Sequence, residues 1–210
     1  MIRVIIADDH PIVRAGLNQI IAEDSFITVA GEAANGPELL EKVRKDGYDI
    51  VLLDLSMPGM EGIDVLKQLK IEQPQLPVII LTVHPESQYA LRILKAGASG
   101  YITKESASVE LIKAIRKVHG GGRYITPSLA EKIAFALGGD STQLPHEALS
   151  DREYQVLCML GSGKTVSQIA DNLALSVKTI STYRTRILEK MRMQNNAELI
   201  HYAVQNGLAE

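Results

Sequence analysis

The sequence predicts two domains, an α/β domain with a doubly wound, five-stranded parallel sheet and, after it, an all-α domain of four helices. Three observations lead to this fold class. Short β-branched runs alternate with helical spacing over the first 122 residues, which is the pattern of a parallel sheet covered by helices on both faces. The third and fourth runs are continuously apolar, as in strands buried on both sides. After Ser150 only helical patterns remain.

The strands and helices of the first domain, residues 1–122, alternate throughout its length. We expect strands at the following positions: 3–7, 28–33, 50–54, 78–82 and 100–103. The intervals between them, and the one after the last strand, carry apolar residues at helical spacing, as at Leu39, Leu40 and Val43. This alternation favours parallel strands joined by helical crossovers.

Residues 123–148 are expected to form a linker with one short helix. Gly120-Gly121-Gly122 ends the α/β pattern, and Thr126 followed by Pro127 is typical of a helix start. The apolar residues of the short helix recur every four positions: Leu129, Ile133 and Leu137. Such a stripe must dock on another apolar surface.

The second domain, residues 149–210, has clear helix starts. Ser150 and Glu153 have the spacing of a capping box. The later helices are expected to begin at Thr165 or Ser167, at Ser176, and at Asn196. Short turns join them, and no internal repeat is seen.

Composition excludes several classes of protein. With 46% hydrophobic and 22% charged residues, the 210-residue chain can form real cores, which argues against intrinsic disorder. The longest apolar runs fall far short of the roughly 18 residues that a membrane span needs. A single cysteine, Cys158, excludes an internal disulfide and a cysteine-based zinc site. We therefore expect a cytoplasmic protein that does not associate with membranes.

Polar side chains follow four strands of the predicted sheet. Asp8 and Asp9 come after the first strand, Asp54 ends the third, Thr82 ends the fourth, and Lys104 follows the fifth. The carboxyl ends of parallel strands share one edge of the sheet, so these groups should converge there. Three carboxylates together need a compensating cation, and oxygen ligands favour Mg²⁺. A hydroxyl and an ammonium nearby suit a bound phosphoryl group.

Residues 1–120 closely resemble the receiver domain of two-component response regulators, which has a flavodoxin-like fold. The matching residues are Asp8-Asp9, Asp54, Met57-Pro58-Gly59, Thr82, Gly97, Gly100, Tyr101 and Lys104. The resemblance implies that Asp54 accepts a phosphoryl group from the phosphohistidine of a sensor histidine kinase. It implies that Lys104 pairs with phosphoryl oxygens, that Thr82 moves to hydrogen-bond the group, and that Tyr101 turns inward behind it. The implied Mg²⁺ ligands are Asp8, Asp9, Asp54 and the backbone carbonyl of Ser56.

Other functions for the first domain fit less well. A dinucleotide-binding fold would need glycines after the first strand, where Asp8-Asp9-His10-Pro11 stands. Phosphatases that form an aspartyl-phosphate have a second acid two residues after the nucleophile, where Ser56 stands; His10 is therefore a local structural residue rather than a catalytic base. In the receiver family, the positions of Ser56 and His84 tune hydrolysis of the phosphoryl group. Val83 replaces the smaller residue common there, which leaves phosphoryl access and lifetime open.

The sequence around Gly161-Ser162-Gly163-Lys164-Thr165 resembles the end of a phosphate-binding loop only superficially. That motif needs a glycine where Cys158 stands, and it needs a preceding strand where residues 151–160 have a helical pattern. The glycines are expected to end one helix and turn into the next. Cys158 is expected to be a packed core thiol.

The helix expected over 177–192 has two different faces. Its apolar side consists of Ile180, Ile187, Leu188 and Met191. Its opposite side consists of Lys178, Thr182, Thr185 and Arg186, flanked by Thr179 and Ser181. Hydroxyls and basic groups on one face suit a helix in the major groove, where hydroxyls meet base edges and cations meet phosphates. A solvated amphipathic helix is the alternative.

The overall charge of the chain does not indicate a nucleic-acid binder, but the charge along the helix expected over 177–192 is basic. The net charge is −3, and residues 149–210 hold 7 basic and 6 acidic residues. Five of those basic residues lie between 178 and 192 with a single acid, Glu189. A basic stripe on a nearly neutral domain is a candidate phosphate-contacting surface.

The second domain is similar to the LuxR-type helix-turn-helix domain. The similarity lies in Leu149-Ser150-Asp151-Arg152-Glu153, Ile169-Ala170, Leu175-Ser176, Lys178-Thr179-Ile180 and Ile187-Leu188. Joined to a receiver, it resembles the NarL/FixJ family of response regulators, and within it the GacA/UvrY type. The resemblance implies a scaffold helix near 166–174, a recognition helix near 177–191 and a final helix near 196–206 that pairs two domains. Leu199, Ile200 and Val204 could form that apolar seam or pack internally.

The leading hypothesis is a transcription regulator controlled by phosphorylation, which binds double-stranded DNA as a homodimer when active. Two copies would then occupy half-sites about one helical turn apart. Two alternatives stay open. The helices could bind a protein instead of DNA, or the chain could be an enzyme that uses Asp54 as a covalent nucleophile, which the missing second acid disfavours.

Overall fold

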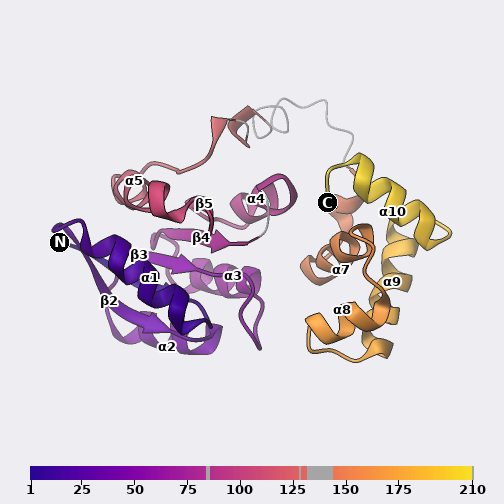
Figure 1. Cartoon of the computed structure of the whole chain (residues 1–210), viewed down its shortest axis with the longest axis horizontal. Helices are drawn as coiled ribbons and strands as arrows, with labels where there is room; N and C mark the ends of the chain where they lie inside the picture. The colour runs from indigo at the N-terminus through magenta and orange to yellow at the C-terminus, as the bar shows by residue number, and fades with distance from the viewer. Residues whose placement is uncertain (84–85, 128, 132–143, 210) are drawn as a thin grey trace. The chain divides into compact units, whose positions relative to one another are not determined.

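The structure is a computed structural model, and it describes residues 1–83, 86–127, 129–131 and 144–209, without the side chains of 86–88 (Figure 1). The chain divides into two compact units, Met1–Lys132 and Ile133–Glu210.

The first unit contains a parallel sheet with the strand order β2-β1-β3-β4-β5. Its strands are β1 (Ile2–Ala7), β2 (Ile27–Ala33), β3 (Ile50–Leu53), β4 (Val78–Thr82) and β5 (Gly100–Thr103). This confirms the predicted doubly wound sheet, and the strand ends agree with the prediction to within one residue. Asp54 is the one polar residue placed differently, because β3 ends at Leu53 and Asp54 begins the loop after it.

Helices join each pair of consecutive strands and follow the last one. They are α1 (Pro11–Ala22), α2 (Gly36–Lys45), α3 (Gly62–Glu72), α4 (Glu86–Lys95) and α5 (Ala107–His119). Helices α1 and α5 pack on one face of the sheet, and α2, α3 and α4 lie on the other side (Figure 1). Helices therefore cover both faces of the sheet and leave its carboxyl edge, where the polar residues lie, between them.

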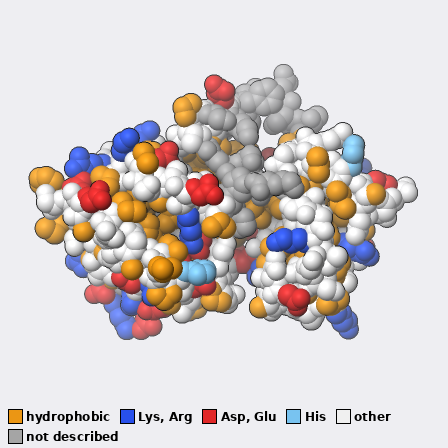
Figure 2. All heavy atoms as spheres, viewed as in Figure 1, with side chains coloured by type: hydrophobic (Ala, Val, Ile, Leu, Met, Phe, Trp, Pro, Cys, Tyr) orange, Lys and Arg blue, Asp and Glu red, His pale blue; other side chains and the backbone are white. Residues whose placement is uncertain are grey.

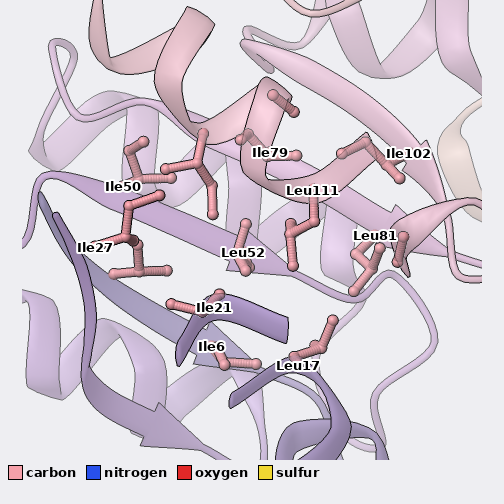
Figure 3. Close-up of a cluster of buried hydrophobic side chains, with 14 of the residues drawn as sticks. Ile6, Leu17, Ile21, Ile27, Ile50, Leu52, Ile79, Leu81, Ile102 and Leu111 are labelled. Atoms are coloured by element: carbon pink, nitrogen blue, oxygen red, sulfur yellow. The ribbon is translucent and has the colours of Figure 1, made fainter. Parts of the chain in front are cut away.

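Figure 3 shows the core on the α1 and α5 side of the sheet. Leu17 and Ile21 of α1 and Leu111 of α5 meet strand residues that alternate along the sheet. Those strand residues include Ile6, Ile27, Ile50, Leu52, Ile79, Leu81 and Ile102. Burial of each such side chain stabilises the fold by about 1.5–3 kcal/mol.

The segment after α5 returns to the sheet at Tyr124. Its backbone N–H donates to Ser99 O at 2.9 Å, and its carbonyl accepts from Tyr101 N at 3.2 Å. This pairing forms a parallel bridge beside Gly100, where a Cβ would lie only 3.2 Å from the Cβ of Tyr124. The start of the expected linker is thus attached to the edge of β5.

Part of the expected linker helix is described. Residues 127 and 129–131 are helical, and Thr126 Oγ1 accepts from Leu129 N at 3.2 Å, as the predicted helix start requires. Ile133, Leu137 and the loop at 138–143 lie outside the described residues. A short 3₁₀ helix, η1 (Pro145–Ala148), was not expected from the sequence and lies within the second unit, before its first α-helix.

The second unit is helical, as predicted. It comprises α7 (Asp151–Gly161), α8 (Val166–Asn172), α9 (Val177–Met191) and α10 (Asn196–Gln205). Ser150 caps α7 in the predicted capping box with Glu153, and Thr165, rather than Ser167, caps α8. Ser176 and Asn195 cap α9 and α10. Each N-cap oxygen accepts a backbone N–H that the helix itself leaves unpaired.

The core of this unit joins all four of these helices through Leu157, Ile169, Ile187 and Leu199, each fully buried. In the same unit, Lys190 of α9 and the buried carboxylate of Glu153 form an ion pair at 2.7 Å. The Lys190 contact therefore ties the end of α9 to the start of α7. Within the described part of the chain, no helix combines the length and apolar character needed to cross a membrane.

Candidate functional site

Two buried carboxylates meet at the carboxyl edge of the sheet. Asp8 follows β1 and Asp54 follows β3, two neighbouring strands, and the two residues are only 1% and 2% exposed. Backbone hydrogen bonds continue the sheet past the strand ends: Asp8 N donates to Ala33 O and Asp54 N to Ala7 O. The sheet itself therefore brings these side chains together, as their strand-end positions predict.

Lys104 lies between these two carboxylates. Its Nζ is 2.7 Å from Asp8 Oδ2 and 2.9 Å from Asp54 Oδ2. Lys104 N also donates to Thr82 O at 2.8 Å, which extends the β4–β5 ladder to the lysine. One ammonium thus bridges groups that are 96 and 50 residues away along the chain (104 − 8 and 104 − 54).

Asp9 and His10 complete the acidic cluster. His10 Nδ1 is 2.8 Å from Asp9 Oδ1 and 3.3 Å from Asp8 Oδ1, and His10 N donates to Asp8 Oδ1 at 2.9 Å. His10 is largely exposed and makes these contacts on the outer side of the cluster. This placement supports its prediction as a local structural residue.

Burial and neighbouring charges shift the pKa values of Asp54 and Lys104 in opposite directions. Burial raises the pKa of Asp54 above its ordinary value, and the hydrogen bond from Lys104 opposes that rise only in part. Burial alone would lower the pKa of Lys104, but its bonds to Asp8 and Asp54 raise it instead. The two carboxylates therefore favour the charged form of Lys104, while burial favours the neutral form of Asp54 and the charge of Lys104 opposes that effect.

The donor set fits a divalent metal ion. Ligand atoms of Asp8, Asp9, His10 and Asp54 all lie within 4.8 Å of one another. Oδ2 of Asp8 and Oδ1 of Asp9 are buried but accept no well-aligned hydrogen bond from the described residues; their close contacts are the ion pairs with Lys104 and His10. Three carboxylates against one lysine leave an excess of negative charge that a hard cation with oxygen ligands would compensate.

The loop after Asp54 is held close to the strand end. Ser56 is exposed, and its N–H donates to Asp54 Oδ1 at 3.2 Å. At the start of α3, Gly62 N donates to Leu55 O at 3.2 Å, and a Cβ on Gly62 would lie 2.7 Å from Asp54 O. Gly59 has φ +90°, which favours glycine in this loop. The sequence alone did not indicate that residue 62 must be glycine, because the need for a residue without a Cβ comes from a close contact across the loop.

Thr82 and Tyr101 lie on β4 and β5, and both are buried, at 0% and 3% exposure. Thr82 is the last residue of β4, at the same edge as Asp54, and Tyr101 is turned into the protein. Val83, directly after Thr82, is 67% exposed. His84 lies outside the described residues.

In the helical unit, the polar face of α9 has the exposure that the sequence predicts. Ile180, Ile187 and Met191 are buried, while Lys178, Thr182, Thr185 and Arg186 are exposed and Thr179 and Ser181 are half-buried. Helix α8 precedes α9 across a tight turn in which Ala174 has φ 51°. Cys158 is buried in α7, as expected, and α7 occupies the position where a phosphate-binding loop would need a strand.

The hydroxyls of this face are already hydrogen-bonded to their own helix. Thr182 Oγ1 donates to Lys178 O at 3.0 Å, Ser181 Oγ to Val177 O at 2.9 Å, and Thr185 Oγ1 to Ser181 O at 3.1 Å. These bonds were not expected from the sequence. They leave the oxygen lone pairs as acceptors, so the hydroxyls can receive a hydrogen bond without breaking the one they donate.

The charges are distributed in small groups. Figure 2 shows basic and acidic side chains interspersed on the visible face of each unit. On α9, Lys178, Arg186 and Lys190 are all exposed, but Lys190 is paired with Glu153. Arg184 is half-buried, and its Nε has no hydrogen-bond partner among the described residues. Because Lys190 is paired and Arg184 is half-buried, fewer of the five basic residues between 178 and 192 are available to contact phosphates than their number in the sequence indicates.

Comparison with known proteins finds a family match in each of the two units. Residues 4–116 match the response regulator receiver domain, and residues 147–203 match the LuxR family of bacterial regulatory proteins. The chain is 37% identical to response regulator UvrY of Escherichia coli K12 over 99% of its length and 96% of the relative. It is 39% identical to response regulator GacA of Pseudomonas protegens over 100% of its length and 99% of the relative.

The chain belongs to the LuxR-type response regulators. In this family a receiver is joined to a helix-turn-helix domain, so the chain is a phosphorylation-controlled transcription regulator and not a conventional enzyme. The predicted family and its GacA/UvrY-type relatives are confirmed.

Solved structures of similar regulators include complexes with DNA. RcsB of Salmonella enterica serovar Typhimurium, bound to the rprA promoter with the phosphomimetic BeF₃⁻, is 30% identical and has a TM-score of 0.66. The alignment covers 96% of this response regulator and 97% of that chain. A second structure contains two RcsB dimers on two parallel DNAs, with 29% identity, a TM-score of 0.60, and coverage of 97% and 98%.

Proposed function

We propose that this response regulator accepts a phosphoryl group on Asp54 and thereby changes its dimerisation and its sequence-specific DNA binding. The observation that supports the acceptor assignment is the contact of Lys104 with both Asp8 and Asp54 at the edge of the sheet. Of the buried carboxylates in this cluster, Asp54 has the loop of Ser56 beside it and Thr82 at the end of the neighbouring strand. A carboxylate, an ammonium and a hydroxyl at one edge of the sheet are the groups that such a phosphoryl transfer would use.

The reaction is a transfer from a sensor histidine kinase. An Asp54 carboxylate oxygen attacks phosphorus, the P–N bond of the phosphohistidine breaks, and an O–P bond forms to give an aspartyl phosphate. Lys104, now bonded to Asp8 and Asp54, is available to pair with the phosphoryl oxygens. Because burial raises the pKa of Asp54, the Lys104 charge also helps to keep the nucleophile ionised.

We propose Mg²⁺ as the metal ion of the site. The residues that would hold it are Asp8, Asp9, Asp54 and the backbone carbonyl of Ser56. When bound, Mg²⁺ supplies charge neutralisation for the phosphoryl oxygens. This choice is supported by the oxygen donors and by the excess of three carboxylates over one lysine at the site.

Thr82 and Tyr101 are the proposed switch residues. The phosphoryl group adds about −1.5 to −2 charges, and it can act only by binding one of two conformations better. The Thr82 hydroxyl and the Lys104 ammonium would supply that preference, and Tyr101 would occupy the space behind Thr82. Both residues are buried, so a change in either requires rearrangement of their neighbours.

The proposed DNA contacts lie on α9. Lys178 and Arg186 would bind phosphates, and the hydroxyls of Thr182 and Thr185 would accept hydrogen bonds at base edges in the major groove. Thr179 and Ser181 flank this surface. The exposure of the four central residues, Lys178, Thr182, Thr185 and Arg186, and the RcsB–DNA complexes support the assignment.

Dimerisation would involve α10. Leu199 packs internally, but Val204 is 58% exposed and Ile200 is half-buried, so these two can form the seam. The structure of RcsB dimers on DNA supports a homodimer as the active form. The proposed domain boundaries stay at 1–122, 123–148 and 149–210. We infer a cytoplasmic location, which suits a buried cysteine, Cys158, that forms no disulfide.

Intact mass spectrometry tests the acceptor. The full-length protein is treated with acetyl phosphate and Mg²⁺, and a single phosphoryl adduct is expected that is absent from Asp54→Ala. Asp64→Ala, which changes an exposed aspartate of α3, is the matched control and should keep the adduct. A phosphoryl group on Asp54→Ala would refute the assignment.

A sequence-selection experiment tests the DNA-binding function. Random duplexes are selected with the phosphodonor-treated and the untreated protein, and treatment should enrich a pair of half-sites about one helical turn apart. Enrichment of no sequence by either form would favour a protein partner for α9.

A further inference from the structure

Arg14 of α1 contacts the backbone of the acidic cluster. Its Nη1 donates to the carbonyl oxygen of Asp8 at 2.7 Å. That carbonyl belongs to the peptide that joins Asp8 to Asp9, so the bond fixes the peptide plane from which both side chains extend. Arg14 is not a member of the carboxylate cluster, and neither the sequence analysis nor the proposed ligand set uses it.

The guanidinium is held from its other side by Glu32 of β2. Arg14 Nε donates to Glu32 Oε2 at 2.8 Å, while Asn18 Nδ2 donates to Glu32 Oε1 at 2.7 Å. Asn18 also donates to Arg14 O at 3.1 Å, and the Arg14 side chain is only 16% exposed. A planar fork with one arm on a carboxylate and the other on a carbonyl has little freedom to move.

The charge of Arg14 is compensated where it stands. The hydrogen bond from Arg14 lowers the pKa of Glu32 despite the opposing effect of its partial burial, so this carboxylate is ionised at neutral pH. An uncompensated guanidinium beside the cluster would repel a metal cation. With Glu32 in place, Arg14 supplies a hydrogen bond at Asp8 and adds no net charge to its surroundings.

We infer that Arg14, locked by Glu32, is a positioning residue for the divalent-cation site: it orients the Asp8–Asp9 peptide so that both carboxylates face one ion. The inference rests on the proposed function and extends it to residues outside the ligand set. In metal sites, groups that orient the ligands typically change metal affinity by roughly 10- to 100-fold when removed.

The direction in which Arg14→Leu changes the affinity for Mg²⁺ distinguishes a positioning role from a purely electrostatic one. Arg14→Leu removes a cation near the site, so a purely electrostatic role predicts tighter binding of Mg²⁺. A positioning role predicts weaker binding, because the peptide loses its orientation. A role confined to joining α1 to β2 predicts lower thermal stability with unchanged Mg²⁺ affinity.

The test is a titration of the full-length protein with MgCl₂, followed by isothermal calorimetry at fixed ionic strength. We expect the Kd of Arg14→Leu to rise roughly 10-fold, the lower end for such residues. Arg14→Lys should lie between this variant and wild type, because one ammonium cannot bind Glu32 and the Asp8 carbonyl in the same forked geometry. In acetyl phosphate reactions, the variant should need more Mg²⁺ for half-maximal phosphorylation, and saturating Mg²⁺ should restore most of the rate.

Arg44→Leu is the matched control. Arg44 of α2 forms a comparable forked ion pair with Glu72 of α3, through Nε at 2.7 Å and Nη2 at 2.5 Å, and neither residue belongs to the acidic cluster. Its loss should leave the Kd for Mg²⁺ unchanged. Circular dichroism confirms that each variant is folded before titration.

Each outcome has a defined meaning. An Arg14→Leu protein that is folded and binds Mg²⁺ as tightly as wild type, or more tightly, overturns the inference and leaves the phosphoacceptor assignment intact. Wild-type protein that binds no Mg²⁺ overturns both. A phosphoryl adduct on Asp54→Ala would refute the proposed function on separate grounds.

Discussion

The two proposed functional surfaces are built in opposite ways. The acidic cluster assembles side chains from the ends of β1, β3 and β5, and its two central carboxylates, Asp8 and Asp54, are buried. The polar face of α9 comes from one helix, is exposed, and bonds mainly to its own backbone. A buried site depends on the whole fold, whereas a helix face depends on local periodicity and on the packing behind it.

This difference has consequences for substitution. In the cluster, one lysine bonds two carboxylates, so a change at any member alters the others. On α9, the exposed residues make few contacts with one another, so their contributions should be separable and graded. The following predictions test that contrast.

The largest effect is expected from Asp54→Ala on the response of DNA binding to a phosphodonor. Moving a two-state equilibrium from 1:99 to 99:1 takes about 5.5 kcal/mol, and this variant should lose the whole phosphoryl-dependent share of it. Fluorescence anisotropy with a selected duplex, before and after acetyl phosphate, measures the change. Basal affinity should persist, and a full response in the variant would contradict the prediction.

On α9, two single substitutions should have different signatures. Lys178→Ala should weaken binding to all duplexes and reduce the slope of log K against log salt by about 1. Thr182→Ala should instead reduce discrimination between preferred and altered sites by about 1 kcal/mol, with an unchanged salt slope. Salt titrations of both variants on two duplexes separate the effects, and identical behaviour of the pair would argue against the assigned roles.

Gly62→Ala should destabilise the receiver by about 1–3 kcal/mol, because the added methyl group overpacks the loop after β3. The new Cβ would lie 2.5 Å from Leu55 Cα and 2.7 Å from Asp54 O. Gly16→Ala, in α1 with nothing within 4 Å of its Cβ, is the control and should stabilise by about 0.5–1 kcal/mol. Urea unfolding measures both; equal shifts would show that the loop adapts.

The smallest effect is expected at the ion pair between Lys190 of α9 and Glu153 of α7, and it concerns how the stability of Lys190→Gln depends on pH. Although burial alone would raise the pKa of Glu153, its bonds to Lys190 and Ser150 lower it below the ordinary 4.5. The unfolded chain therefore binds the proton more tightly, so this stabilisation is present above about pH 4.5 and is lost as the pH falls through the folded-state pKa.

At pH 7, Lys190→Gln should lower the free energy of unfolding by about 1 kcal/mol, since Lys190 is partly exposed and solvent screens the pair. The variant should also lose less stability than wild type between pH 5 and pH 3 in urea titrations. Lys178→Gln changes an exposed lysine of the same helix and should follow the wild-type curve. A parallel fall for Lys190→Gln and wild type would remove the ion pair as the cause.

The sequence predicted the cluster well because a topological rule determines it. Once the strands are parallel, Asp8, Asp54, Thr82 and Lys104 must share an edge, whatever the details of packing. The polar face of α9 followed from helical periodicity, and the capping box at Ser150 followed from spacing. These features depend on the order of residues and on element type, both of which are visible in the sequence.

Other features depend on side-chain directions that only the folded chain shows. Arg14 could have pointed to solvent from α1, and its bond to the Asp8 carbonyl has no sequence signature. Lys190 counted toward a basic stripe but bonds Glu153 from another helix. The helix hydroxyls at Ser181 and Thr182 bond backward along α9, although their pattern indicated only that they face outward.

The attachment of Tyr124 to the edge of β5 bears on how information leaves the receiver. The segment that exits toward the DNA-binding half is anchored on both sides of Gly100, and one of its two hydrogen bonds comes from the amide of Tyr101 itself. The exit point is therefore hydrogen-bonded to the backbone of the proposed switch tyrosine. A displacement of that backbone would disturb one of the two bonds that hold the start of the outgoing chain.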